Sequence, residues 1–172
     1  GPMGTRGFRD RVRYPVSMSS AEQPYDLVVI GSGPAGQSAA IQASKLHKRV
    51  AIVEKERRVG GVCAFTGTIP SKTLREAIIE AVGPSRLGGS EWHLTRRPEM
   101  SELLDRVGQV MKSEAAVVRD SLARNDVEVI EAEASFVDAH RIALDEGTGR
   151  RVIETDQVLV ACGTKEIGRA HV

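Results

Sequence analysis

The first pattern in the chain is a pair of short apolar runs on either side of an alanine-rich stretch. Residues 26–30 and 50–54 are apolar runs of strand length, the pattern of strands that are buried on both faces of a parallel sheet. Residues 35–48 contain no Gly after Gly36 and no Pro, so they predict a helix. Strand, glycine turn, helix and strand within about thirty residues form a βαβ unit, whose crossover is expected to be right-handed.

The middle of the chain predicts two helices separated by a loop. Residues 68–82 predict a helix in which Pro70 is tolerated because it falls in the first turn. Residues 83–97 are rich in Gly, Pro and charge and predict a loop. From 98 to 124, apolar residues recur at the i, i+3, i+4 spacing of one buried helix face, and Asn125 is a suitable C-cap.

Beyond the second of these helices, the pattern predicts four short strands. They cover residues 127–130, 141–145, 151–155 and 157–161. The second and third are expected to pair as a hairpin through Glu146–Gly149. The whole pattern predicts an α/β fold with a parallel sheet, a long helical excursion and a small β-hairpin.

The composition narrows the class of protein. The 172 residues suffice for one domain, Lys plus Arg (24) nearly balance Asp plus Glu (23), and aromatic residues make up only 3% of the chain. The chain has no excess of positive charge to attract a phosphate backbone and few aromatic side chains on which bases could stack. No nucleic-acid partner is therefore expected. No apolar run reaches the ~20 residues of a membrane-spanning helix, and no membrane partner is expected.

The cysteines and the chain start add two further expectations. Cys63 and Cys162 are far apart and show neither a disulfide nor a zinc spacing, and the histidines show no metal-ligand spacing. No metal site is predicted, and a reducing cytoplasm is the simplest location. Residues 1–24 are rich in Arg, Gly and Pro without an apolar segment, and they predict a disordered arm.

A glycine motif follows the first predicted strand. The sequence Gly31-Ser-Gly-Pro-Ala-Gly36 fits G-x-G-x-x-G, in which Gly31 makes the tight turn, Gly33 lets the backbone approach a pyrophosphate, and Gly36 lets the helix pack on the strand. The helix N-terminus offers free N–H groups and a partial positive charge to phosphates. Glu54 is placed to accept hydrogen bonds from ribose hydroxyls, and its charge would repel the 2′-phosphate of NADP. These residues predict a Rossmann-like dinucleotide site.

Two further segments resemble a known family. Gly60-Gly-Val-Cys63 and Gly67-Thr-Ile-Pro-Ser-Lys72 resemble the flavoprotein pyridine nucleotide-disulfide oxidoreductases, and the resemblance extends from about Tyr25 to Thr164. It implies that the dinucleotide is FAD and that these segments run past its pyrophosphate and along the isoalloxazine. It also implies that Lys72 lies near the flavin N5, where an ammonium can stabilise the negative charge of reduced flavin.

Thr68 departs from the pattern of the disulfide reductases of this family. Cys63 is present, but Thr68 stands where those enzymes have their second cysteine. A threonine can neither form a disulfide nor act as a thiolate, so the relay that serves dithiol substrates is absent. The pattern G-V-C-x-x-T-G-T-I-P-S-K-T-L-R-E is similar to the soluble, Si-specific NAD(P) transhydrogenases of the family, which implies that NADPH reduces the FAD and NAD+ then takes the hydride. Cys63 is expected to be structural, with a reactive lone thiol as the alternative.

Two later segments also resemble the family. Glu131–Phe136 is similar to the strand whose backbone meets the adenine, and Thr155–Thr164 is similar to the strand that ends under the FAD, although either could equally be an ordinary strand. The complete set of residues expected to bind the cofactor is Gly31, Gly33, Pro34, Ala35, Gly36, Glu54, Lys55, Gly60, Gly61, Val62, Cys63, Gly67, Thr68, Lys72, Glu133, Ala134, Ala161, Cys162 and Gly163.

The resemblance stops before the domains that complete the family's enzymes. Residues 25–164 are therefore interpreted as a truncated FAD-binding domain, and 165–172 as a non-native tail, of which Glu166–Val172 resembles a translated sequencing adapter. The fragment is expected to be inactive and to retain FAD weakly or not at all. The parent enzyme is expected to be a homodimer that takes NAD(P)H as substrate.

Two other functions stay open. One is another flavoenzyme of the family, such as an NAD(P)H oxidase, a quinone reductase or a dihydrolipoamide dehydrogenase-like protein that has lost a cysteine. The other is a non-catalytic module that binds FAD or contacts a partner.

Overall fold

The computed structural model describes residues 23–82 and 99–164. Its elements are β1 (Tyr25–Ile30), α1 (Pro34–Lys45), β2 (Val50–Glu54), α2 (Gly61–Phe65), α3 (Thr68–Val82), α4 (Met100–Arg124), β3 (Glu128–Glu131), β4 (Glu133–Phe136), β5 (Arg141–Asp145) and β6 (Arg150–Val160). Almost all of the arm expected at 1–24, the loop expected at 83–97 and the tail at 165–172 lie outside the described residues.

The strands of the described residues form one sheet in the order β3-β2-β1-β6-β5-β4. Strands β3, β2, β1 and β6 are parallel to one another, whereas β6 pairs with β5 and β5 with β4 in antiparallel fashion. The predicted parallel sheet and the predicted hairpin, which is formed by β5 and β6, are therefore confirmed. The parallel half brings the carboxyl ends of four strands to one edge of the sheet.

Strand β6 corrects the prediction of two separate strands at 151–155 and 157–161. Glu154 pairs with Arg141 of β5, and Thr155 pairs with Tyr25 of β1, so the ladder changes partner without a break. Asp156 is a residue type that strands disfavour, which made this point resemble the end of a strand. Here it marks the transfer of one long strand from the antiparallel half to the parallel half.

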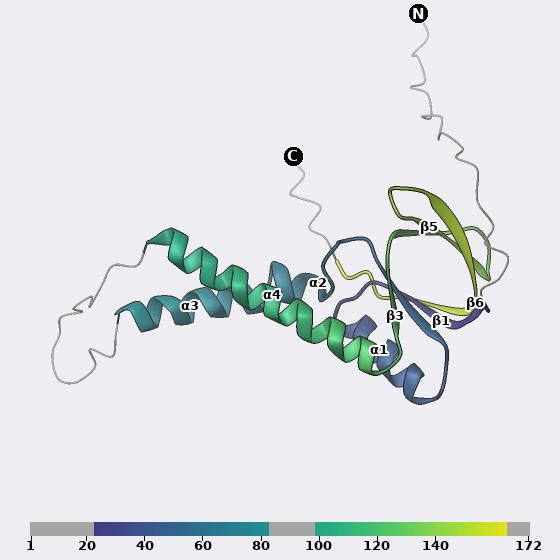
Figure 1. The fold of residues 1–172 in the computed structure, drawn as a ribbon, viewed down its shortest axis with the longest axis horizontal. Helices are drawn as coiled ribbons and strands as arrows, with labels where there is room; N and C mark the ends of the chain where they lie inside the picture. Colours follow the sequence, from purple (N-terminus) through teal and green to yellow (C-terminus); the bar gives the residue numbers. More distant parts are fainter. Residues whose placement is uncertain (1–22, 83–98, 165–172) are drawn as a thin grey trace, which may run out of the picture.

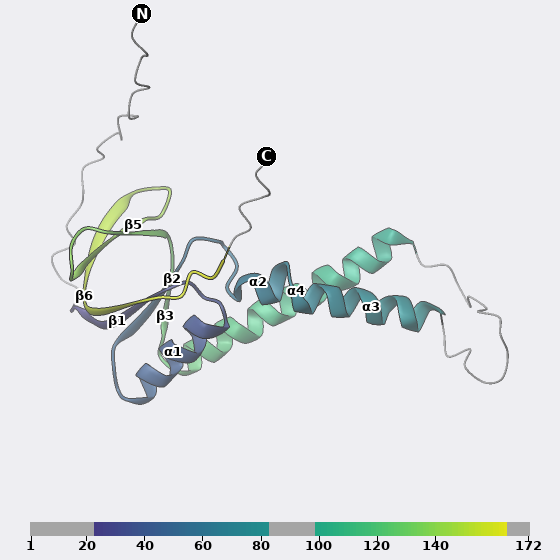
Figure 2. The same ribbon diagram turned by 180° about the vertical axis from the view of Figure 1, so that it is seen from behind.

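The sheet separates two layers of structure. Helix α1 and the C-terminal part of α4 cover one face of the parallel half (Figure 1), and the antiparallel half folds over the other face, as the view from behind also shows (Figure 2). On the helix side, Val29, Val50 and Ile52 pack with Ala40 of α1 and Leu122 of α4. These contacts bury the apolar faces of both helices against the sheet.

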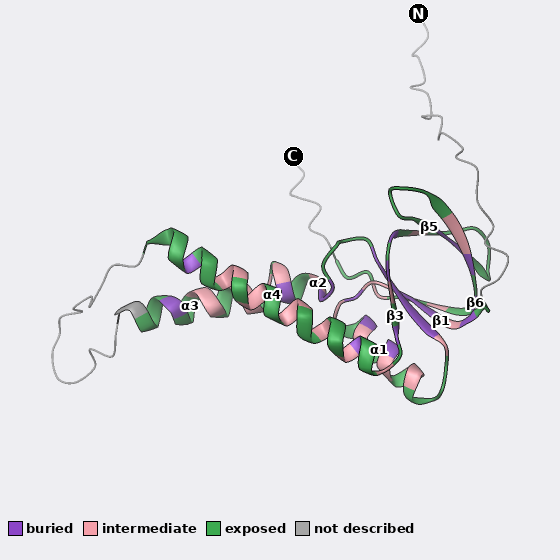
Figure 3. Ribbon diagram, in the orientation of Figure 1, coloured by how far each residue is buried: buried purple, intermediate pink, exposed green. Residues whose placement is uncertain are grey.

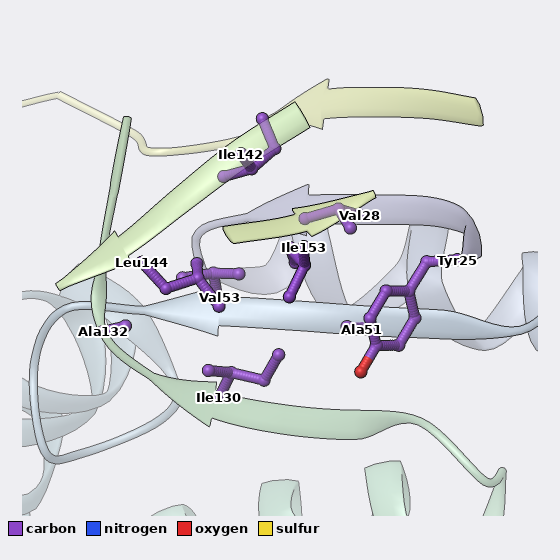
Figure 4. Packing of buried hydrophobic residues seen from close by; sticks show 9 residues of the cluster. All are labelled: Tyr25, Val28, Ala51, Val53, Ile130, Ala132, Ile142, Leu144 and Ile153. Atoms are coloured by element: carbon purple, nitrogen blue, oxygen red, sulfur yellow. The ribbon is translucent and has the colours of Figure 1, made fainter. Parts of the chain in front are cut away.

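The second core lies between the two halves of the sheet. Ala51 and Val53 of β2 point away from the helices because side chains alternate along a strand, and they pack with Ile142, Leu144 and Ile153 of the antiparallel half (Figure 4). Strand β2 is thus buried on both faces, as its continuous apolar run predicts.

Two helix ends differ from the prediction. Helix α1 ends at Lys45 instead of residue 48, because His47 adopts a φ of 58° and turns the chain back toward β2. Helix α4 begins at Met100 instead of residue 98, because Glu99 and Glu102 form a capping box that fixes its start. Its predicted end at Asn125 is confirmed.

Helix α2 was not predicted, because its first residues were interpreted only as a glycine turn. Gly60 and Gly61 do form a turn, with φ of 129° and 67°, but five residues of helix, Gly61–Phe65, begin at once. This short helix leads, after two residues, into α3, which begins at Thr68.

Helices α3 and α4 lie side by side as a long hairpin that projects away from the sheet (Figure 1). Most residues of the hairpin are exposed or only partly buried (Figure 3). Arg106 of α4 donates two hydrogen bonds to the carboxylate of Glu80 of α3, at 2.5 and 3.1 Å, and so joins the two helices. This hairpin is the predicted helical excursion.

Leu122 is the point at which α4 is anchored to the sheet, and it has no exposed surface. We expect Leu122→Ala to lower the free energy of unfolding by about 2–5 kcal/mol, because a buried leucine leaves a cavity. The matched control is Leu104→Ala, on the same helix at a position that is 57% exposed, with an expected change within about 0.5 kcal/mol. Urea unfolding followed by circular dichroism measures both, and equal effects would contradict the described packing of α4.

Asp26 at the start of β1 gives the stability of the fold a dependence on pH. Its carboxylate accepts hydrogen bonds from Lys48 Nζ at 2.9 Å and from Arg49 N at 2.7 Å, which hold the pKa of Asp26 below its ordinary value. A lowered pKa stabilises the folded state above the ordinary carboxyl range near about pH 4, and this contribution is lost as the pH falls through the lower pKa of the folded state.

We expect the difference in unfolding free energy between the unaltered protein and Asp26→Asn to be constant near neutral pH and to shrink below about pH 4. Urea titrations at a series of pH values measure this difference. A difference that stayed constant or grew on acidification would contradict a lowered pKa of Asp26 in the folded state.

Candidate functional site

The carboxyl edge of the parallel half carries the glycine turn that follows β1. Gly31 has a φ of 107°, a conformation that other residues rarely adopt, and its N–H donates to Val53 O at 2.8 Å. A Cβ at Gly31 would lie 2.4 Å from the carbonyl oxygen of Ala161, just after β6. The turn therefore needs glycine because the backbone of the β6 end passes directly against it.

Gly36 and Gly33 differ in what requires them. A Cβ at Gly36 would lie 2.0 Å from the oxygen of Gly31, so this glycine allows α1 to pack on the turn. A Cβ at Gly33 would meet no atom within 4 Å, and its φ of −68° suits any residue. Neither backbone conformation nor packing within the described chain explains a glycine at position 33, which instead leaves open space beside the start of α1.

The N-terminus of α1 is suited to an anion. Its N-cap, Gly33, supplies no side-chain hydrogen bond, Pro34 opens the helix, and the first turn has no acidic residue. The partial positive charge of the helix end is thus not compensated by a side chain of the helix itself. Pro34 and Ala35 are exposed at this end of the helix.

Glu54 ends β2 beside this turn and is only 8% exposed. Its Oε2 accepts hydrogen bonds from both the N–H and the hydroxyl of Ser32, at 2.9 and 2.5 Å, and its Oε1 accepts one from Glu56 N at 3.1 Å. These donors compensate the burial of the charge. One acceptor position stays available on Oε1, since a carboxylate accepts about four hydrogen bonds.

The second glycine pair places α2 against the first turn. A Cβ at Gly61 would lie 2.8 Å from Gly33 Cα, and one at Gly60 would lie 2.8 Å from Ala64 Cβ. Gly60 N donates to the hydroxyl of Ser32 at 3.1 Å. The predicted residues Gly31, Gly33, Gly60 and Gly61 are therefore brought together in one place.

Cys63, Thr68 and Lys72 follow on the two helices that lead away from this turn. Cys63 is exposed on α2, Thr68 opens α3, and Lys72 lies one turn later on the same face of α3, where both are exposed. Gly67 N donates to Val62 O at 2.8 Å, and so connects α2 to α3. All three residues therefore lie on α2 and the first turns of α3, which directly follow the second glycine pair.

The later predicted residues divide between two places. Ala161 N donates to Ile30 O at 2.8 Å, which sets Ala161, Cys162 and Gly163 at the end of β6 beside the glycine turn. Glu133 and Ala134 lie on β4, where they pair with β5, and Ala134 packs against the core.

The junction between β3 and β4 nevertheless lies close to the site. Ala132 N donates to Glu54 O at 3.0 Å, so the start of β4 is next to the end of β2.

Two residues of this region were not predicted. Ser32 has no exposed surface and connects Glu54 with Gly60, and its place inside the glycine motif was the signal that could have found it. Arg119 of α4 donates to Arg57 O at 3.1 Å and also to the carboxylate of Glu131. It holds the loop that contains Lys55, and nothing in the local sequence indicated this contact.

Within the described ranges, no group of three or more His, Cys, Asp or Glu side chains is arranged to hold a metal ion. None of the helices in those ranges is both long and apolar enough to cross a membrane.

Curated proteins that are similar to this chain share one name. The chain is 45% identical over 145 residues to the soluble pyridine nucleotide transhydrogenases of Mycobacterium bovis (strain BCG / Pasteur 1173P2) and Mycobacterium tuberculosis (strain ATCC 25177 / H37Ra), with 82% of this chain and 31% of each relative covered. The protein of that name from Hahella chejuensis is 36% identical over 152 residues. The chain thus spans about a third of the length of these relatives.

Solved structures show the same fold. The HOCl-induced flavoprotein disulfide reductase RclA from Escherichia coli, as its Cu(II) complex, superposes with a TM-score of 0.72 at 23% sequence identity, over 86% of this chain and 30% of that one. A second structure of the same reductase gives a TM-score of 0.69. The family model described as pyridine nucleotide-disulphide oxidoreductase matches residues 25–168. With this match over most of its length, the chain belongs to the pyridine nucleotide-disulphide oxidoreductase family.

Proposed function

We propose that this chain is the FAD-binding part of an enzyme that transfers hydride from NADPH to NAD+. The relatives at 45% identity are named transhydrogenases, and the fold is that of a flavoprotein of known structure. Because the chain spans only 31% of those relatives, the activity, the nicotinamide sites and the expected homodimer are proposed for the complete protein. A cytoplasmic location is proposed with them.

The geometry of the carboxyl edge fits the pyrophosphate and adenosine of FAD. The open space at Gly33 and the uncompensated start of α1 suit a pyrophosphate, which needs close backbone approach and positive charge. Glu54 keeps one acceptor position on Oε1 that suits a ribose hydroxyl. The same carboxylate disfavours a 2′-phosphate, so we propose that NADP binds elsewhere in the complete protein.

The observation that carries the proposed reaction is Thr68 at the start of α3. This position follows Cys63 at the spacing of a redox-active cysteine pair in the disulfide reductases that the sequence resembles. A hydroxyl cannot take the place of the second thiol, so electrons have no disulfide through which to leave. Direct transfer from the flavin remains possible, and the transhydrogenase names of the relatives favour a second nicotinamide nucleotide as the acceptor.

Lys72 is proposed to supply positive charge to this exchange. Bound FAD would supply the site that accepts and returns the hydride. Lys72 is exposed on the face of α3 that also carries Thr68, so its ammonium can lie beside a bound ring system without first breaking an ion pair that the structure records. A fixed positive charge favours the reduced, more negative state of the cofactor.

A second function differs in the electron acceptor. Cys63 is an exposed, free cysteine on α2, and it does not select NAD+ as that acceptor. An enzyme of the family that uses an oxidant other than NAD+, such as a quinone reductase, an NAD(P)H oxidase or a dihydrolipoamide dehydrogenase-like enzyme, would have the same FAD site. The acceptor assay below separates these possibilities.

Gly33→Ala tests the cofactor site. We expect the dissociation constant of FAD to rise by about tenfold to a hundredfold, because a methyl group fills the space that the pyrophosphate needs, while the free energy of unfolding hardly changes. The control is Gly108→Ala on α4, where a Cβ also meets no atom within 4 Å. Ultrafiltration of the flavin-free full-length protein with FAD, read by flavin absorbance, gives the constants. An unchanged affinity for FAD in Gly33→Ala would rule out pyrophosphate binding at this turn.

Lys72→Met tests the reaction in the full-length protein. We expect that protein to reduce thio-NAD+ with NADPH and to be inactive toward glutathione disulfide and lipoamide. We expect Lys72→Met to lower kcat by about a hundredfold, the usual effect of removing one stabilising charge. Lys112→Met, an exposed lysine of α4, is the control and should keep the full rate. Absence of thio-NAD+ reduction would reject the transhydrogenase reaction, and turnover of a quinone instead would support the second function.

A further inference from the structure

Ser32 joins three segments of the site through one side chain. It has no exposed surface, although it lies in the turn that faces the open space at Gly33. Its hydroxyl donates to Glu54 Oε2 at 2.5 Å and accepts from Gly60 N at 3.1 Å. Gln37 Nε2 donates to the Ser32 carbonyl oxygen at 2.7 Å, which ties the same residue to α1.

The two bonds from Ser32 decide how the Glu54 carboxylate is oriented. Oε2 accepts from both the N–H and the hydroxyl of Ser32 and is thereby fully used. Oε1 has a single donor, Glu56 N, and keeps an acceptor position. Without the hydroxyl, each oxygen would keep one backbone donor, Ser32 N on Oε2 and Glu56 N on Oε1, and each would then have one vacant position.

We propose that Ser32 is a positioning residue that orients Glu54 so that Oε1 alone receives a ribose hydroxyl of the dinucleotide. The proposal rests on the dinucleotide site of the proposed function and adds a residue that acts through Glu54. The same hydroxyl holds Gly60 N, and so keeps the second glycine pair close to Gly33. The Ser32 side chain therefore acts in two ways. It orients Glu54 toward the ribose, and it holds the two glycine turns together.

The test uses ligands that differ only in the ribose. Binding of ADP and of 2′,3′-dideoxy-ADP to the chain is measured by equilibrium dialysis, and the ratio of the two dissociation constants reports the contribution of the ribose hydroxyls. We expect the unaltered chain to prefer ADP, and Ser32→Ala to reduce that preference about tenfold, the usual effect of a lost hydrogen bond to a charged group. The control, Ser38→Ala at an exposed position of α1, should keep the full preference.

The preference ratio separates positioning from a structural role. If Ser32 only shapes the turn, Ser32→Ala weakens both ligands by the same factor and the ratio stays unchanged, which would overturn the proposal. Glu54→Gln should reduce the preference as well, and Ser32→Ala combined with it should reduce it little further, because both act through one carboxylate. Independent, multiplicative effects would also overturn the proposal.

Two further outcomes concern the folding of Ser32→Ala and the binding of ADP by the unaltered chain. Should Ser32→Ala fail to fold by circular dichroism, Ser32→Cys gives the same comparison with a side chain of similar size and a weaker donor, and the preference should fall by a smaller factor. An unchanged preference in a folded Ser32→Cys would count against the proposal. Absence of ADP binding by the unaltered chain would overturn the role of Ser32 in this chain, and absence of FAD from the full-length protein would in addition reject the dinucleotide site.

Discussion

The close approach of backbone to backbone at the carboxyl edge of the parallel strands is the constraint on which the rest of the structure depends. Gly31 lies against Ala161 at the end of β6, and Gly36 lies against Gly31, with no room for a Cβ at either glycine. Gly61 lies in the same way against Gly33. A larger residue at these contacts would move β6, α1 or α2 away from β1, and the residues of the site would separate.

Buried charge at this edge is compensated within the same turn. The Glu54 carboxylate has lost most of its contact with water, and three donors from Ser32 and Glu56 replace that hydration. A buried carboxylate satisfied in this way adds little stability by itself, but it is held in one orientation. Orientation is what a group that recognises a sugar hydroxyl requires, which connects the packing of the turn to its proposed chemistry.

The helical hairpin has a different physical character from the sheet. Leu122 anchors the end of α4 in the core, whereas the outer part of the hairpin is joined by exposed pairs such as Glu80 with Arg106. Exposed ion pairs contribute little to stability, so the hairpin depends on the contact between its two helices and on the anchor. Its importance for the site is positional, because α3 begins with Thr68 and α4 returns the chain to β3.

Most elements and the motifs of this chain could be predicted from local patterns of residues. Apolar runs and helical spacing predicted β1, β2, α3 and α4 closely, because each pattern reflects burial along a single element. The spacing of the glycines located the turn, and Thr68 could be recognised because the G-G-x-C and I-P-S-K segments around it set the register of the motif.

The pairing partners of these elements depend on contacts between distant parts of the chain. The union of the two predicted strands into β6 depends on partners at both ends, β5 and β1, that no local pattern records. The contacts of Ser32 with Glu54 and Gly60 join positions 22 and 28 residues apart, and Arg119 reaches Arg57 across 62. Local sequence patterns report the burial of a residue but not the identity of its neighbours, and so the path of β6 and the hydrogen bonds between Ser32 and Glu54 became visible only in the folded chain.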